Sequence, residues 1–149
     1  MTAPTQVQAT VVARRQEDGW VGAALTGPSG VGKTGLALGL VARGWRLVAD
    51  DAALIWTSGG RLWARAPRPI AGRIEARGLG LVSVVHRDVC RLELAVTLGL
   101  VEPERLPDPG CDTWLGLPLR ALAVQARAAA APDIVALALT EAMRRPVSP

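Results

Sequence analysis

Residues 27–34 read GPSGVGKT, and the interpretation of the whole chain depends on them. They fit the pattern G-x-x-x-x-G-K-[ST] of phosphate-binding loops, or P-loops, without a gap. The apolar run 21–25 before them suits a buried strand, and the leucine-rich segment 33–43 after them is long enough for a helix. Glycines let the loop turn several backbone N–H groups toward one anion, and the N-terminus of the helix adds partial positive charge behind it.

The pattern assigns a role to each end of the loop. Lys33 is predicted to reach the β- and γ-phosphates of ATP, and the Thr34 hydroxyl to ligate Mg²⁺. Lys33 is also the only lysine among 17 basic residues, which agrees with a position that needs a compact ammonium group. ATP and Mg²⁺ are therefore the expected cofactors, and the residues expected to bind them are Gly27, Pro28, Ser29, Gly30, Val31, Gly32, Lys33 and Thr34.

Length and composition indicate one folded domain. The 149 residues, half of them apolar, can bury a core, and we expect a single domain over 1–149 with flexible tails at 1–6 and 146–149. No apolar run is long enough for a membrane span, and the N-terminus lacks the pattern of a secretory signal, so a cytoplasmic location is expected. The absence of Phe and Tyr removes the usual stacking platforms for nucleic acid, which is not expected as a partner.

The remaining chain predicts more strands than helices. Hairpins are expected at 7–13 with 20–25 and at 54–56 with 62–64, further strands at 46–49, 81–85 and 115–126, and helices at 70–77 and 132–145. The run 89–98 predicts a long strand, at the edge of the sheet, with Leu92, Leu94, Val96 and Leu98 on one face. The fold class is therefore α/β, with a P-loop in a mixed sheet flanked by helices.

Acidic residues follow the strand after the P-loop helix. Asp50 and Asp51 end the strand 46–49, and strand ends at that edge face the phosphate site in α/β sheets. Two neighbouring carboxylates could hold Mg²⁺ and accept a proton, and mutual repulsion should raise one pKa; a solvated turn is the alternative. Glu75 alone is an ordinary exposed acid. The surrounding arginines either receive an anion or form a solvated face: Arg61, Arg65, Arg68, Arg73 and Arg77.

Three stretches together resemble the catalytic domain of the HPr kinase/phosphorylase family. They are GPSGVGKT, then 44–51 (GWRLVADD), which is similar to the family's G-x-x-L-V-A-D-D segment, and 74–82 (IEARGLGLV), which is similar to its E-x-R-G-L-G signature. Residues 115–119 (LGLPL) resemble a later strand of the family. The resemblance covers about 7–139 and corresponds to a short form without the N-terminal domain of longer members.

This resemblance implies a fold, a reaction and a set of residue roles. The fold is related to phosphoenolpyruvate carboxykinase. The reaction moves the ATP γ-phosphate to a serine of the phosphocarrier HPr or a similar carrier, with phosphorolysis by inorganic phosphate as the reverse activity, in a homo-oligomer that is typically a hexamer. Asp50 is the implied general base, with Lys33 and Asp51 also catalytic. The implied Mg²⁺ ligands are Thr34, Glu75 and Asp51.

The chain departs from the family pattern at two places. Gln8 stands where the family usually has a His in its first strand, and a Gln side chain carries no titratable proton. The basic, glycine-containing segment of longer members has no clear match in 126–132. Two alternatives therefore stay open: a non-catalytic ATP-binding sensor on the same fold, and a P-loop NTPase or kinase with another acceptor.

Overall fold

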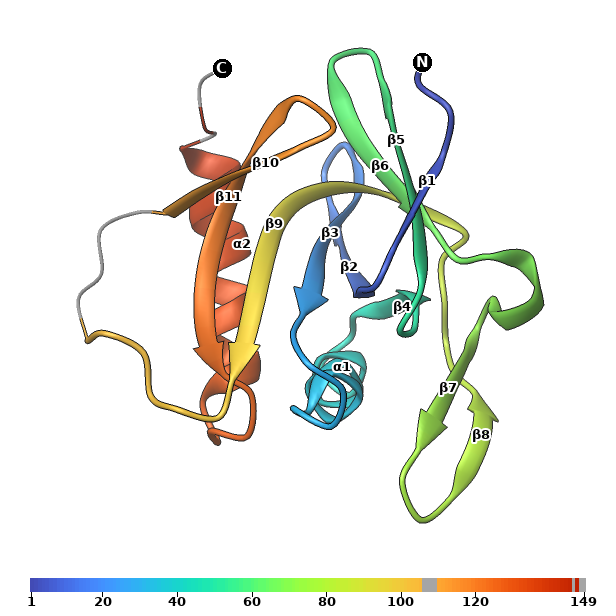
Figure 1. Cartoon of the computed structure of the whole chain (residues 1–149), viewed down its shortest axis with the longest axis vertical. Coiled ribbons are helices and arrows are strands. Elements are labelled where there is room, and N and C mark those ends of the chain that lie inside the picture. Colours follow the sequence, from blue (N-terminus) through green and yellow to red (C-terminus); the bar gives the residue numbers. More distant parts are fainter. Residues whose placement is uncertain (106–109, 146, 148–149) are drawn as a thin grey trace.

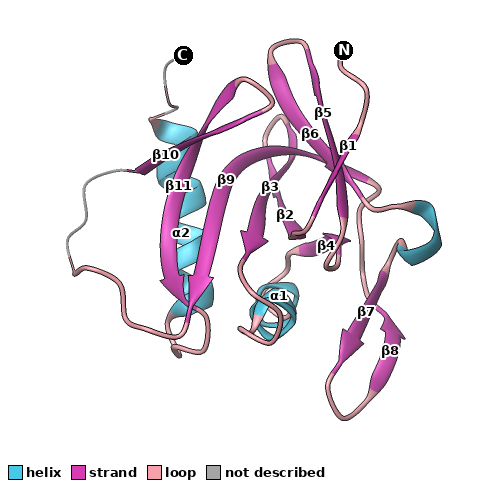
Figure 2. Ribbon diagram, in the orientation of Figure 1, coloured by secondary structure: helices cyan, strands magenta, loops and turns pink. Residues whose placement is uncertain are grey.

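The structure is a computed structural model that describes residues 1–105, 110–145 and 147. Figure 1 shows a strongly curled sheet with the helices α1 and α2 beside it and the hairpin β7–β8 projecting at one end, and Figure 2 shows how much of the chain is strand. The helices are α1 (Lys33–Val41) and α2 (Ala131–Arg144), with a 3-10 turn η1 (Arg68–Ile70). The strands are β1 (Thr5–Val7), β2 (Thr10–Gln16), β3 (Gly19–Thr26), β4 (Arg46–Ala49), β5 (Ala53–Ser58), β6 (Arg61–Arg65), β7 (Arg73–Ala76), β8 (Gly80–Ser83), β9 (Val89–Gly99), β10 (Gly110–Trp114) and β11 (Leu117–Gln125).

The mixed α/β fold predicted from the sequence is confirmed. Within the described residues the main sheet has nine strands, with the order β1-β5-β6-β9-β3-β2-β4, with β11 added beside β9 and β10 beside β11. The strand β9 pairs with β3 and β11 in parallel and with β6 antiparallel. Because β3, β9 and β11 run in parallel, their C-terminal ends all reach the edge of the sheet where α1 begins.

The long strand β9 is central, so its predicted place at an edge is wrong. The predicted single apolar face is also wrong, because Leu92 packs in a different core from Leu94. The register explains this: Gly22 of β3 lies opposite Leu92, and Ala23 lies opposite Leu94, which leaves Glu93 as an extra residue in β9. Such a bulge reverses the alternation of side chains. The Glu93 carboxylate accepts a 2.8 Å hydrogen bond from the mostly buried Arg91.

The segment 70–77 was expected to be helical and instead contains the strand β7. Two glycines with positive φ flank the strand β7, Gly72 (φ 73°) before it and Gly78 (φ 85°) after it, and this backbone conformation breaks any helix there. β7 pairs antiparallel with β8, and the N–H of Leu79 donates to the carbonyl of Ala76 at 3.0 Å in the turn. The alternating sequence therefore satisfies its backbone groups across a hairpin.

The predicted N-terminal tail is largely structured. Residues 5 and 6, expected in a flexible tail over 1–6, belong to β1 and pair with β5. The Thr2 N–H donates to the Thr57 carbonyl at 3.0 Å, and the Thr57 N–H donates to the Thr2 hydroxyl at 2.8 Å. At the other end, 146 and 148–149 lie outside the described residues, so most of the C-terminal tail prediction does too.

Two cores fill the two faces of the sheet. One core packs both helices against the sheet, with Leu36 and Leu40 of α1 and Val135 and Leu139 of α2 all at 3% exposure or less. The other lies inside the curl of the sheet and is made mostly by strands, for example by Val11, Ala24 and Cys90, with no helix residue among its buried members. Both helices therefore cover the same face, and this arrangement places α1 at the edge where β3 and β4 end.

Candidate active site

The loop between β3 and α1 has the backbone that a P-loop needs. Gly27, Gly30 and Gly32 all have positive φ, at 150°, 81° and 117°, and residues with a Cβ rarely adopt such backbone angles. A Cβ at Gly27 would lie 2.9 Å from the Leu98 carbonyl oxygen, so the loop runs directly against β9. Gly32 is the N-cap of α1, which leaves the first N–H groups of that helix facing the loop.

Lys33 is buried and turned into this loop. Only 7% of the residue is exposed, and its Nζ donates to the carbonyl oxygens of Gly27 at 2.6 Å and Pro28 at 3.4 Å. These two hydrogen bonds hold the ammonium group against the backbone of the loop. It is therefore positioned to exchange a carbonyl partner for a phosphate oxygen.

Asp50 lies at the centre of the acidic part of the site. Its Oδ1 accepts from the hydroxyl of Thr10 at 3.2 Å and, over a long 3.4 Å, from the hydroxyl of Thr34, while its Oδ2 accepts from the N–H of Glu75 at 3.3 Å. Asp50 thus joins the end of β4 to the first turn of α1 and to β7. Burial raises the pKa of the Asp50 carboxyl above its ordinary value, and these three hydrogen bonds only partly offset that effect. Repulsion by Asp51, the expected cause, is the smallest contribution.

Asp51 differs from Asp50 in environment and in backbone. It is exposed, and its φ of 65° is in the left-handed region, which few non-glycine residues adopt and in which Asp is enriched. Its N–H donates to the Thr10 hydroxyl at 3.1 Å, so one threonine fixes both aspartates. The Thr34 hydroxyl contacts Asp50, and the Mg²⁺ ligand set of Thr34, Asp51 and Glu75 stays a prediction.

A single cleft brings these groups together. It encloses about 1120 Å³ between the P-loop, the end of β4, the hairpin β7–β8 and the connection from β11 to α2. The predicted site residues that line this cleft are Ser29, Gly30, Gly32, Lys33, Thr34, Asp50, Asp51 and Glu75. Gly27 contributes through its carbonyl oxygen, which accepts a hydrogen bond from Lys33, while Gln8 is exposed and is not among the lining residues.

Carboxylate and hydroxyl oxygens are the ligands that Mg²⁺ prefers, so the donor set of this cleft fits that ion. The described residues contain no group of three or more His, Cys, Asp or Glu placed to hold a metal by themselves.

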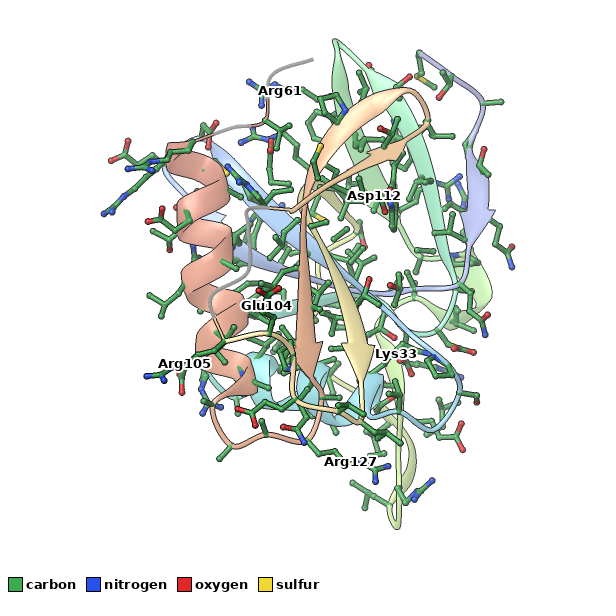
Figure 3. All side chains as sticks on the ribbon, turned by 60° about the vertical axis from the view of Figure 1, so that its left-hand side comes forward. Lys33, Arg61, Glu104, Arg105, Asp112 and Arg127 are labelled. Carbon is green, nitrogen blue, oxygen red and sulfur yellow. The ribbon has the colours of Figure 1, made fainter. Side chains whose placement is uncertain are left out.

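Two residues of the cleft were missed by sequence reasoning. Arg127 follows β11, and its guanidinium donates to the Gly30 carbonyl at 2.9 Å, which ties the β11–α2 connection to the P-loop. Figure 3 shows Lys33 and Arg127 at the same end of the molecule, far from Arg61. No motif marks Arg127, because its place depends on β11 running parallel to β9. For Thr10 the sequence did contain a signal, a hydroxyl side chain within an apolar strand. In the structure Thr10 is fully buried, and a buried hydroxyl needs a hydrogen-bond partner.

The sequence model of one protein family, described as the HPr Serine kinase C-terminal domain, matches residues 19–97. The chain belongs to this family. The matched part runs from β3 through the P-loop, Asp50 and Glu75 to β9, so it contains all the acidic side chains of the cleft. The family resemblance predicted from the sequence is therefore confirmed. In the part of the chain that the structure describes, no helix has the length and apolar character needed to cross a membrane.

Individual members of the family are similar to parts of this chain. The HPr kinase/phosphorylase of Brevibacillus brevis is 43% identical over 94 residues, which is 58% of this chain and 30% of that protein. The HPr kinase/phosphorylase of Clostridium beijerinckii is 47% identical over 64 residues, 43% of this chain and 21% of that protein. The aligned part thus spans less than a third of these relatives. Among solved structures, the HPr(Ser) kinase/phosphatase of Coxiella burnetii has the same fold, with a TM-score of 0.75 at 22% identity over 94% of this chain and 96% of that one.

Proposed function

We propose that this chain is a protein serine kinase that uses ATP and Mg²⁺ to phosphorylate a serine of an HPr-like phosphocarrier protein. The observation that carries the proposal is the convergence of Lys33, Thr34 and Asp50 in one cleft behind a glycine loop. A P-loop by itself binds nucleotide, and transfer also needs a group that receives the proton of the attacking hydroxyl. The family membership and the HPr kinase/phosphorylase relatives support the carrier serine as the acceptor.

In this proposal each side chain has one task. Lys33 and the loop N–H groups hold the β- and γ-phosphates. The Asp50 carboxylate takes the proton of the serine hydroxyl as the serine oxygen bonds to the γ-phosphorus, the bond from that phosphorus to the bridging oxygen breaks, and ADP leaves. Thr34, Asp51 and Glu75 would hold Mg²⁺, which when bound neutralises charge on the phosphates. A raised pKa suits a general base at Asp50, because the pKa of an efficient general base lies near the working pH.

The reverse reaction is part of the same proposal. With inorganic phosphate in the cleft, Asp50 would return the proton to the serine oxygen, and the phosphoryl group would pass to inorganic phosphate to give pyrophosphate. Arg127 and Arg77 line this cleft and offer guanidinium groups to the second phosphate. A homo-oligomer, with the hexamer as the expected form, and a cytoplasmic location remain predictions. The mass of the complex in solution tests the first, and fractionation of the producing cell tests the second.

The test is phosphate transfer from labelled ATP to an HPr carrier with Mg²⁺, measured for the full chain and for three variants. We expect label on a carrier serine, and a loss of at least about a hundredfold for Lys33→Ala and for Asp50→Asn, because each removes a group that acts directly on the reacting atoms. Asp112→Asn is the matched control, since Asp112 is exposed and lies at the other end of the molecule (Figure 3). Equal loss in Asp112→Asn would contradict the assignment of Asp50.

The alternative of a nucleotide-binding sensor rests on two departures from the family pattern: Gln8 in place of the usual His, and no clear match in 126–132 to the basic, glycine-containing segment. The same experiment separates the candidates. ATP binding that depends on Lys33 without any transfer would indicate the sensor. Release of inorganic phosphate with no label on the carrier would indicate an NTPase or a kinase with another acceptor. Asp51→Asn adds one distinction, because a metal ligand should be rescued in part by higher Mg²⁺, whereas a base should not.

A further inference from the structure

We propose that a second pocket, separate from the P-loop cleft, binds a small anion that carries a phosphate group. This arginine pocket encloses about 390 Å³ between the end of β4, the connection from β6 through η1, and the residues just before β9. Its positively charged lining comes from Arg65, Arg68 and Arg87, and it shares no lining residue with the P-loop cleft. Two of these arginines, Arg65 and Arg68, belong to the basic stretch 61–77 and have no role in the proposed kinase mechanism.

Positive charge exceeds negative charge in the arginine pocket, whose lining has three arginines and one acid, Asp88. Within the described residues, neither Arg65, Arg68 nor Arg87 has an Asp or Glu oxygen within 4.0 Å. The single acid of the lining, Asp88, faces the His86 imidazole at 3.6 Å. By contrast, Arg61 and Arg91 of neighbouring strands are both paired with Glu93. Three cations around one hollow repel one another, and an anionic ligand would relieve that repulsion.

Two of the three arginines, Arg65 and Arg87, are held in place before any ligand arrives. The Arg87 guanidinium lies 5.0 Å from the centre of the Trp20 ring, and that of Arg65 lies 5.9 Å from the Trp56 ring. The backbone of Arg87 is also fixed, because its N–H donates to the Leu47 carbonyl at 2.9 Å. Guanidinium groups stacked on indole rings lose less conformational freedom on binding, which favours affinity.

The rest of the lining defines the kind of ligand. Val48 and Ala66 are buried, and with Ala71 and Val89 they give the arginine pocket an apolar wall. Arginine binds phosphate oxygens through two parallel hydrogen bonds, and the volume lies in the range of small-molecule sites. The shared chemistry is therefore a phosphate group, supplied either by free inorganic phosphate or by a phosphate monoester whose carbon skeleton meets the apolar wall.

Calorimetric titration of the full chain carrying Lys33→Ala, which weakens phosphate binding at the P-loop, tests this inference. Inorganic phosphate and glycerol 3-phosphate are the two probes. We expect one site, weakened about tenfold or more by Arg68→Ala and by Arg87→Ala, because each removes a charge-assisted hydrogen bond. Arg73→Ala is the matched control: Arg73 belongs to the same basic stretch, is exposed, and lines neither the arginine pocket nor the P-loop cleft.

The outcomes are distinct from those of the kinase assay. Tighter binding of glycerol 3-phosphate identifies a monoester as the ligand class, and equal binding identifies free phosphate. Absence of binding to the Lys33→Ala chain, or binding that neither Arg68→Ala nor Arg87→Ala weakens, overturns the inference. Arg68 is exposed and lies outside the core, so its variant decides the matter if Arg87→Ala does not fold, which thermal unfolding shows.

Discussion

The two faces of the sheet are packed with different side chains. Among the described residues, the core under the helices has 19 buried members, of which four are alanine, while the core inside the curl has 15, of which eight are alanine. Helices and sheets pack about 10 Å apart, and large side chains must fill that distance. Inside the curl, strands of one sheet face each other closely, so small side chains fit. Gly22 marks the closest approach, since a Cβ there would lie 2.6 Å from the Cys90 sulfur.

This difference also separates the two binding features. The P-loop cleft lies where the helix-covered face meets the ends of parallel strands, and its loop is a local sequence motif. The arginine pocket lies beside the alanine-rich core, with Val48 and Ala66 common to both. Its arginines come from segments more than 20 positions apart, Arg65 and Arg87 among them, so the curl of the sheet creates it. The comparison predicts that truncation harms the first face and that enlargement harms the second.

The largest expected effect concerns access to the core inside the curl. Cys90 is 1% exposed, and burial raises its pKa to about 12, whereas Cys111 is exposed. At pH 8 only about one in 10⁴ Cys90 side chains is the reactive thiolate. We therefore expect a thiol reagent to modify Cys111 rapidly and Cys90 at least about a thousandfold more slowly, with the Cys90 rate rising about tenfold per pH unit.

Mass spectrometry of the labelled chain measures both rates. The Cys111→Ser variant should show no fast modification, and both cysteines should react in denaturant. Similar rates for the two thiols in the native protein would mean that the inner face of the sheet is open, contrary to the close packing around Gly22.

Truncation on the helix-covered face should produce the next largest effect. Leu40 of α1 is fully buried, and Leu40→Ala should lower the free energy of unfolding by about 2–5 kcal/mol, because it removes apolar contact and leaves a cavity. Urea denaturation measures this. Leu137→Ala on α2 is the control, since 68% of Leu137 is exposed and the change should stay within about 0.5 kcal/mol. Equal losses at both positions would show that α1 does not depend on this core.

Enlargement inside the curl should have a smaller but definite cost. Gly22→Ala adds a methyl group that would lie 2.6 Å from the Cys90 sulfur and 2.9 Å from the Val12 carbonyl oxygen, and the backbone oxygen cannot move away freely. We expect a loss of about 1–3 kcal/mol in the free energy of unfolding. Gly99→Ala provides the matched control in β9, because its Cβ would meet nothing nearer than 4.0 Å.

Double substitution sharpens this last measurement. Cys90→Ala should recover part of the loss in the Gly22→Ala background, because it removes one of the two close contacts and keeps the other. A Gly22→Ala chain as stable as the Gly99→Ala chain would refute close packing between β3 and the strands around it.

Several predictions from the sequence failed for one kind of reason. The helix expected over 70–77 is the strand β7, because Gly72 and Gly78 turn the chain and β8 supplies its hydrogen-bond partners. The single apolar face expected for β9 is divided by the bulge at Glu93. Both depend on the neighbouring strand, which a local pattern does not contain. The same limit hid Arg127, whose contact with Gly30 spans 97 positions of the chain.

The amino-acid order alone determined the glycine loop with Lys33 and Thr34, the strand that ends at Asp50, and the mixed α/β class, because each follows from neighbours within a few positions. Tertiary structure alone decided that Thr10 would hold both aspartates, that Glu75 would approach them on a hairpin, and that Arg65 and Arg87 would share a hollow. The physical reason is that backbone conformation is governed by local sterics and hydrogen bonds, whereas contacts between distant segments depend on how the whole sheet curls.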